Sequence, residues 1–185
     1  MKRLYNTEAH KEEVKAALQD GRLSVILLAL FFPRDARKFL LRVLCVALGA
    51  FLLFKFIFLP LVIRGESMKP TYPAKGFLFC FAPARYLWKP ERGDVVIMRY
   101  GKGTMLLKRV VGLPGDRIAF KKGVLYRNGK ALHEPYTAKP CDWELPERTV
   151  AEGHFYLVGD NRSVPMNEHI FGEMSQKYYA GVPLW

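Results

Sequence analysis

Residues 64–71 read Arg-Gly-Glu-Ser-Met-Lys-Pro-Thr and begin where a long apolar run ends. This stretch decides the fold because it separates a segment long enough to cross a membrane from a remainder made of short, strand-like runs. It also places Ser67 only a few residues beyond the apolar run. Hydroxyl side chains are common at the ends of membrane helices and before turns, so Ser67 indicates chemistry only if the chain supplies a partner for it.

Residues 106–116 offer that partner and read Leu-Leu-Lys-Arg-Val-Val-Gly-Leu-Pro-Gly-Asp. An unperturbed lysine has a pKa of about 10.4, but burial among apolar side chains lowers this pKa. If Lys108 points inward, Arg109 faces the other side of the strand. Ser67 and a desolvated Lys108 are then a nucleophile and its general base. The alternative is a strand that carries two solvated basic residues.

A third stretch, Gly159-Asp160-Asn161-Arg162, completes an ordered set of motifs. The three stretches, behind a membrane anchor, resemble the type I signal peptidases (leader peptidases) over about residues 43 to 172. The resemblance implies a mainly β fold, with an antiparallel β catalytic domain behind an N-terminal transmembrane helix. It also implies a serine endopeptidase that cleaves signal peptides from exported preproteins. Ser67 would be the nucleophile and backbone oxyanion donor, and Lys108 the general base.

The resemblance extends to supporting positions around this pair. In some relatives a hydroxyl two residues before the serine supplies a second oxyanion donor, and here that position is a glycine. Substrates of the family are bound as extended strands, with small pockets that select Ala-x-Ala. The supporting positions in this chain are Gly65, Met68, Pro70, Arg109, Gly159, Asp160, Asn161 and Ser163.

The third stretch then departs from the family pattern. Relatives usually continue to a serine that helps to hold the lysine, and then to Asp-Ser-Arg before an aromatic residue and glycine. This chain has Pro165, Asn167, Glu168 and His169 at those positions. Two hypotheses follow. Ser163 orients Lys108 in place of the missing serine, and Asn167 with His169 keeps a weaker, neutral contact in place of the family's Asp–Arg ion pair. The departures favour a divergent specificity or a reduced activity.

The composition of the chain limits the classes of partner that we expect. The chain has 185 residues, of which 50% are hydrophobic, and a formal net charge of +12. The basic residues are spread along the chain without a nucleic-acid recognition motif, so we expect no nucleic acid. Attraction to anionic lipid head groups explains the charge more simply, and we expect membrane lipid and signal-peptide-bearing preproteins as partners.

The cysteines predict neither a metal site nor a cofactor. Cys45, Cys80 and Cys141 are too far apart in sequence for the pairs that structural zinc sites need. Cys45 lies in the apolar run. Cys80 and Cys141 either form a disulfide in an oxidising compartment or remain free thiols.

The apolar run Val43–Ile63 contains one charged residue, Lys55, and predicts a transmembrane anchor. Basic residues crowd its N-terminal flank, so the positive-inside rule places the N-terminus in the cytoplasm. We therefore expect a single-pass protein of the cell membrane with three parts. Residues 1–42 are a cytoplasmic segment, 43–63 the anchor and 64–185 an extracytoplasmic peptidase domain. Within the first part we expect an amphipathic helix or a loose tail near residues 8–18, and an interfacial run at Leu23–Phe32.

Short runs after the anchor predict strands at residues 77–81, 94–100, 105–111, 117–120 and 155–158. Asn128-Gly129 predicts a hairpin with a type I′ turn between residues 124–127 and 130–132. Residues 133–150 contain three prolines and predict a loop.

Three functional alternatives remain open at this level. The chain is a maturation peptidase dedicated to one pilus or secretion-system substrate, or a peptide-binding assembly factor without catalysis. The third alternative is a Ser-Lys peptidase that cleaves itself, as the related repressor peptidases do.

Overall fold

The computed structural model describes residues 36–101, 103–137, 139 and 141–184, together with Glu12, Lys15 and Ala16, which are helical. The rest of the helix expected near residues 8–18 and the apolar run Leu23–Phe32 lie outside the described residues. The chain separates into two compact units, Met1–Leu52 and Leu53–Trp185. The second unit is called the β domain below.

The apolar helix α3 covers Ala36–Phe56. Its segment Arg37–Phe56 is long and apolar enough to cross a membrane, judged by length and composition. The structure thus places the helix earlier than the predicted span Val43–Ile63. Pro60 explains part of the shift, because its ring fixes φ and it has no amide hydrogen for a helix.

Residues after Ile57 form a strand that the sequence did not predict. β1 (Phe58–Arg64) pairs antiparallel with β2 (Lys75–Phe81) along its whole length. Side chains of β1 alternate between two environments: Leu59, Leu61 and Ile63 pack against a buried cluster, whereas Val62 is exposed. Strand pairing therefore accounts for the last part of the apolar run.

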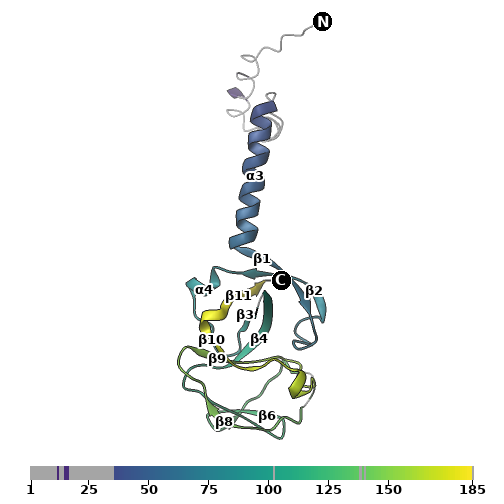
Figure 1. Ribbon diagram of the computed structural model, residues 1–185, viewed down its shortest axis with the longest axis vertical. Coiled ribbons are helices and arrows are strands. Elements are labelled where there is room, and N and C mark those ends of the chain that lie inside the picture. The colour runs from purple at the N-terminus through teal and green to yellow at the C-terminus, as the bar shows by residue number, and fades with distance from the viewer. Residues whose placement is uncertain are drawn as a thin grey trace. The chain divides into compact units, whose positions relative to one another are not determined.

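A seven-stranded antiparallel sheet forms one part of the β domain, in the order β1-β2-β11-β3-β4-β9-β10 (Figure 1). The short helix α4 (Ala84–Leu87) and the 3-10 helices η1 (Met166–Glu168) and η2 (Gln176–Tyr178) lie between strands. The remaining strands of this sheet are β3 (Val95–Tyr100), β4 (Thr104–Gly112), β9 (His154–Val158), β10 (Gly172–Ser175) and β11 (Tyr179–Leu184).

A four-stranded sheet follows, in the order β7-β6-β5-β8. Its strands are β5 (Arg117–Lys121), β6 (Val124–Arg127), β7 (Lys130–Ala131) and β8 (Leu145–Thr149). The β6–β7 hairpin confirms the predicted turn, since Asn128 and Gly129 have φ of 54° and 77°. β8 lies within the predicted loop 133–150 and corrects that expectation. Figure 1 shows β6 and β8 at the end of the domain opposite to β1 and β2.

The core of the β domain follows strand alternation. In β3, Val96 and Met98 pack in one buried cluster and Ile97 in another. The predicted fold class, mainly β and antiparallel, is confirmed. The predicted strands are also present, as β2, β3, β4, β5 and β9. Cys80 is fully buried and Cys141 lies beside a third cluster, and both are free thiols rather than a disulfide.

Candidate active site

Ser67 lies in a tight turn between β1 and β2. The turn is closed by two backbone hydrogen bonds, Lys69 N–H to the carbonyl of Glu66 at 3.1 Å and Tyr72 N–H to that of Met68 at 2.9 Å. Gly65 enters it with φ of 117°, a conformation that favours glycine. The Met68 side chain is 4% exposed and anchors the turn in the core. Ser67 itself is half-buried and faces a cavity.

The Gly159–Asn161 segment holds the backbone of this turn from the other side. Asn161 donates its backbone N–H to the Ser67 carbonyl at 2.9 Å and its side-chain amide to the Glu66 carbonyl at 3.0 Å. A Cβ on Gly159 would lie 2.2 Å from the Ser67 carbonyl oxygen. Glycine is therefore needed at position 159 for this close approach.

Lys108 lies in the middle of β4, opposite Val96 of β3. Its side chain is 2% exposed, and burial lowers its pKa from 10.5 to about 8, while the nearby Asp160 carboxylate acts in the opposite direction. Within the described part of the chain, no hydrogen bond reaches the Lys108 amine. The amine is therefore a buried group that can be neutral near physiological pH.

Ser67 and Lys108 line the same two cavities, of about 450 Å³ and 510 Å³. The first cavity extends between β1 and the start of β4, and its lining includes Met68, Leu78 and Ile97. The second extends toward the segment 161–170. The backbone N–H of Ser67 donates to no described residue, so it is available to a ligand in the cavity.

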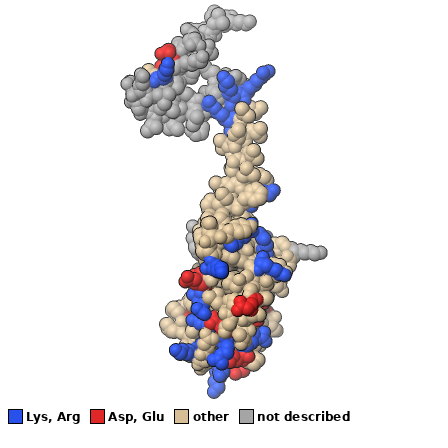
Figure 2. Space-filling view, turned by 90° about the vertical axis from the view of Figure 1, so that its left-hand side faces the viewer, with Lys and Arg blue, Asp and Glu red and all other residues tan. Residues whose placement is uncertain are grey.

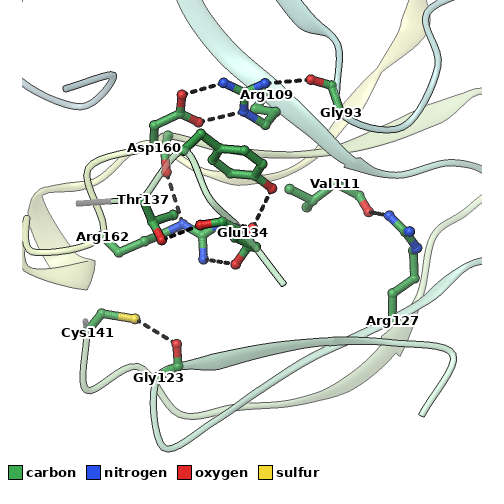
Figure 3. Close-up of polar contacts among 12 residues, drawn as sticks. Gly93, Arg109, Val111, Gly123, Arg127, Glu134, Thr137, Cys141, Asp160 and Arg162 are labelled. Atoms are coloured by element: carbon green, nitrogen blue, oxygen red, sulfur yellow. Dashed lines mark hydrogen bonds and ion pairs between the residues drawn. The ribbon is translucent and has the colours of Figure 1, made fainter. Parts of the chain in front are cut away.

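The side chain of Arg109, on β4, extends toward the carboxylate of Asp160, a residue that is completely buried. Its guanidinium makes a paired contact with the carboxylate at 2.7 and 2.6 Å and also donates to the Gly93 carbonyl at 2.6 Å (Figure 3). The hydroxyl of Thr71 donates to the same carboxylate at 2.5 Å. Asp160 thus ties the turn after Ser67 to the strand that carries Lys108.

Glu134 and Tyr136 belong to this network, and sequence reasoning missed both. Arg162, which is 3% exposed, donates to both oxygens of Glu134 and to the Gly159 carbonyl (Figure 3). The Tyr136 hydroxyl donates to Glu134 at 2.6 Å, and its ring lies 3.9 Å from the Arg109 guanidinium. Glu134 stands in a segment without periodicity, so no pattern in the sequence marks it.

His169, for which the sequence suggested only a neutral contact, also belongs to the site. It is 6% exposed, packs edge-on against Trp143 at 5.1 Å and lines the 510 Å³ cavity with Ser67 and Lys108. Neither ring nitrogen has a hydrogen-bond partner among the described residues. Burial, followed by the charges of Lys108 and Arg162, lowers its pKa to about 3, so the imidazole is neutral.

The contacts of the residues hypothesised to replace the family's lysine-orienting serine (Ser163) and its Asp–Arg ion pair (Asn167 with His169) are as follows in the structure. The Ser163 hydroxyl donates to Asn161 at 2.7 Å. Asn167 is exposed in η1, whereas His169 is packed against Trp143. Pro70 is exposed at the rim of the turn.

The described residues contain no group of His, Cys, Asp and Glu side chains placed to hold a metal ion. Ser67 and Lys108 bring a hydroxyl and a buried amine to the same cavities.

Comparisons with known proteins agree on one family. The family model described as "Signal peptidase, peptidase S26" matches residues 36–182. A probable signal peptidase I-1 from Synechocystis sp. is 30% identical over 152 residues, which cover 77% of this chain and 78% of the relative. Signal peptidase I from Bacillus licheniformis is 33% identical over 144 residues, or 71% of this chain and 77% of the relative. A solved signal peptidase I from Enterococcus faecalis V583 aligns with a TM-score of 0.43 at 28% identity, covering 52% of this chain and 97% of that one.

Proposed function

Since the chain belongs to the signal peptidase family, peptidase S26, and is a serine peptidase by that membership, we propose that it cleaves signal peptides from exported preproteins with Ser67 and Lys108. One observation carries the assignment of the residues. Ser67 and the buried, low-pKa Lys108 line the same cavity, although 41 positions separate them (108 minus 67).

The proposed reaction begins with neutral Lys108. The Ser67 hydroxyl oxygen attacks the scissile carbonyl carbon while the Lys108 amine takes the hydroxyl proton. The Ser67 backbone N–H donates to the oxygen that becomes negative. Lys108 then returns the proton to the leaving amine, and the signal peptide remains as an ester on Ser67. A water molecule, deprotonated by Lys108, hydrolyses that ester and restores both side chains.

His169 is proposed as a positioning residue for Lys108. Both are buried polar groups without partners among the described residues, and both face the same cavity. A neutral imidazole accepts a hydrogen bond from an amine, directly or through one water molecule. Because its pKa is about 3, His169 adds no positive charge beside Lys108 and does not compete with it as a base.

The first cavity supports binding of an extended peptide. β1 is an edge strand of the sheet in the described part of the chain, so its outer edge can pair with a substrate strand. Buried apolar side chains lie beneath that edge, from Met68, Leu78 and Ile97. A substrate strand paired with β1 would place side chains against this apolar lining, as binding of an Ala-x-Ala site requires.

We also place α3 across the cell membrane, with the N-terminus in the cytoplasm and the β domain outside. The support is the length and composition of the helix. Further support comes from the basic residues Arg37, Lys38 and Arg42 near its N-terminal end. Ser67 then lies near the outer membrane surface, where the cleavage site of a membrane-inserted signal peptide also lies.

A peptidase dedicated to one substrate is the second candidate. Pro165, Glu168 and His169, all departures from the family pattern, line the 510 Å³ cavity beside Ser67. Cleavage of a pilin-like or secretion-system substrate in preference to generic preproteins would support this candidate.

The test is cleavage of a preprotein with an Ala-x-Ala site by the purified full chain in detergent, with sequencing of the new N-terminus. We expect cleavage by the wild type and none by Ser67→Ala or Lys108→Ala. Activity should rise with pH and level off above about 8, as Lys108 becomes neutral. Equal activity in Ser67→Ala would exclude the proposed nucleophile.

A further inference from the structure

A small basic pocket lies in the β domain outside both cavities of the active site. It has a volume of about 350 Å³ and is built from α4, β3, η2 and the start of β11. Figure 2 views the side that carries α4 in Figure 1, where Lys and Arg side chains, with some Asp and Glu, are interspersed with uncharged surface. The residues that line the pocket are Arg85, Tyr86, Arg99, Gln176, Lys177 and Tyr179.

Two buried hydrogen-bond donors of the residues that line this pocket have no acceptor in the part of the chain that the structure describes. Tyr179 is 7% exposed, and its hydroxyl is buried and unpartnered. The Nε–H of Arg85 is buried and unpartnered as well. Buried polar groups in native proteins are nearly always hydrogen-bonded, and a donor left alone is destabilising. Two such donors at one pocket indicate that an acceptor binds there.

The charge of the pocket indicates that the acceptor is an anion. Arg85, Arg99 and Lys177 are three cations, no carboxylate lines the pocket, and no described carboxylate forms an ion pair with any of them. Tyr179 remains a donor, because burial, with smaller effects of Asp94 and Cys80, raises its pKa to about 12. Arginine forks and a phenol together suit an anion with several oxygens, and phosphate is such an anion.

The surroundings identify the source of the phosphate as a lipid. Tyr86, Leu87 and Trp88 at α4 are 77%, 64% and 47% exposed, so apolar surface adjoins the pocket. The segment before α4 is joined to the end of the apolar helix, since Ala82 N–H donates to the Ile57 carbonyl at 2.9 Å. If α3 crosses the membrane, Ile57 follows directly on the span, so Ala82, three residues before Arg85, lies near the lipid head groups.

We propose that Arg85, Arg99, Lys177 and Tyr179 form a binding site for the phosphate group of an anionic phospholipid. Arg85 and Tyr179 donate to the phosphate oxygens, and the other two cations balance its charge. The site fastens the β domain to the membrane surface at a second point besides the helix. The proposal rests on the proposed membrane location of α3, and it is independent of the peptidase chemistry.

The test uses the full chain in neutral detergent micelles, where native mass spectrometry counts bound lipids. The probes are phosphatidylglycerol, phosphatidylcholine with the same acyl chains, and inorganic phosphate as a competitor. We expect phosphatidylglycerol to bind more tightly than phosphatidylcholine. Its affinity should fall about tenfold in Arg85→Gln and about threefold in Tyr179→Phe. The matched variants Arg148→Gln and Tyr126→Phe, in the four-stranded sheet, should bind like the wild type.

Three outcomes would overturn the proposal. Unchanged affinity in both Arg85→Gln and Tyr179→Phe, with the fold verified by circular dichroism, would show that the pocket is not the site. Displacement of the lipid by an equal concentration of inorganic phosphate would identify a free-phosphate site. An equal loss of lipid affinity in Arg148→Gln would show that the effect depends on overall charge and not on the pocket. None of these measurements depends on cleavage. The peptidase assignment is tested by the Ser67→Ala comparison alone, so the two proposals can fail independently.

Discussion

Lys108 combines a chemical advantage with a cost in stability. Burial favours the neutral amine, which is the form that can accept a proton from Ser67. The same burial opposes folding whenever the amine is protonated, because the ammonium loses its hydration. The pKa is about 8 in the folded protein and near 10.5 when the chain is unfolded. The unfolded state therefore binds more protons between these pH values.

Lys108→Met should abolish cleavage and make the protein more stable at neutral pH. The difference in pKa corresponds to a penalty of ~3 kcal/mol that the apolar side chain does not suffer. This penalty is complete below pH 8, declines between about 8 and 10.5, and is absent above. Thermal unfolding of both proteins across this pH range measures it. A gain in stability that does not shrink as pH rises would contradict the linkage.

His169→Leu tests the positioning role of the imidazole. Leucine keeps the apolar contact with Trp143 but removes the acceptor proposed for Lys108, which lines the same cavity. We expect kcat to fall about tenfold with little change in KM, because one hydrogen bond to the base is lost. Stability should change little, because leucine places an apolar side chain where the buried ring was and this offsets the loss of one hydrogen bond. His169→Gln, whose amide oxygen can accept, should recover part of the rate.

A purely structural His169 would behave differently. Leu and Gln variants would then change cleavage equally, and any loss would follow thermal stability. The pH profile separates the two roles further. Removing a contact to Lys108 should move the pH at which activity levels off, whereas a packing defect should leave it in place.

At the scale of elements, one irregular segment links the two sheets to the active site. Residues 134–137 lie between β7 and β8; Glu134 accepts hydrogen bonds from Arg162 (Figure 3), and the Tyr136 ring contacts Arg109. Arg162 in turn holds the Gly159 carbonyl, next to the turn of Ser67. The segment therefore acts as a clamp, which means that its contacts with Arg109 and Arg162 hold β4 and the segment after β9 in place around the site.

Glu134→Ala should destabilise the protein by about 3 kcal/mol or more, because it leaves the buried Arg162 guanidinium without its carboxylate. The matched change Glu147→Ala removes the exposed pair with Arg117 at 3.5 Å, and should cost less than about 1 kcal/mol. Chemical denaturation followed by tryptophan fluorescence compares the two. Similar losses in both variants would show that the clamp contributes no more than a surface pair.

At the scale of the whole molecule, the proposed topology determines whether Ser67 can meet a signal peptide. Alkaline phosphatase, which is active only outside the cytoplasm, should be active when fused to the C-terminus of the full chain. The same enzyme fused to the N-terminus should be inactive, because the basic flank of α3 remains in the cytoplasm. The reverse pattern would place the β domain in the cytoplasm and exclude the proposed substrates.

Local patterns in the sequence were sufficient for several parts of this protein. Strand alternation predicted β2, β3, β4, β5 and β9, and Asn128-Gly129 predicted a hairpin turn that the backbone angles confirm. The ordered motifs also predicted Ser67 and Lys108 as a pair, and the structure brings both to one cavity. These features depend on residue type and short spacing, which the sequence displays directly.

Other features were decided only by tertiary structure. Hydrophobicity alone does not show where the apolar run 43–63 changes from helix to strand; Pro60 is a local sign against helix, but the strand itself forms only by pairing with β2. The contacts of Asp160 with Thr71 and of Arg162 with Glu134 join residues 89 and 28 positions apart. The unpaired donors of Arg85 and Tyr179 meet only when α4 packs beside β11. Such contacts depend on how the chain closes on itself, and no local pattern encodes that closure.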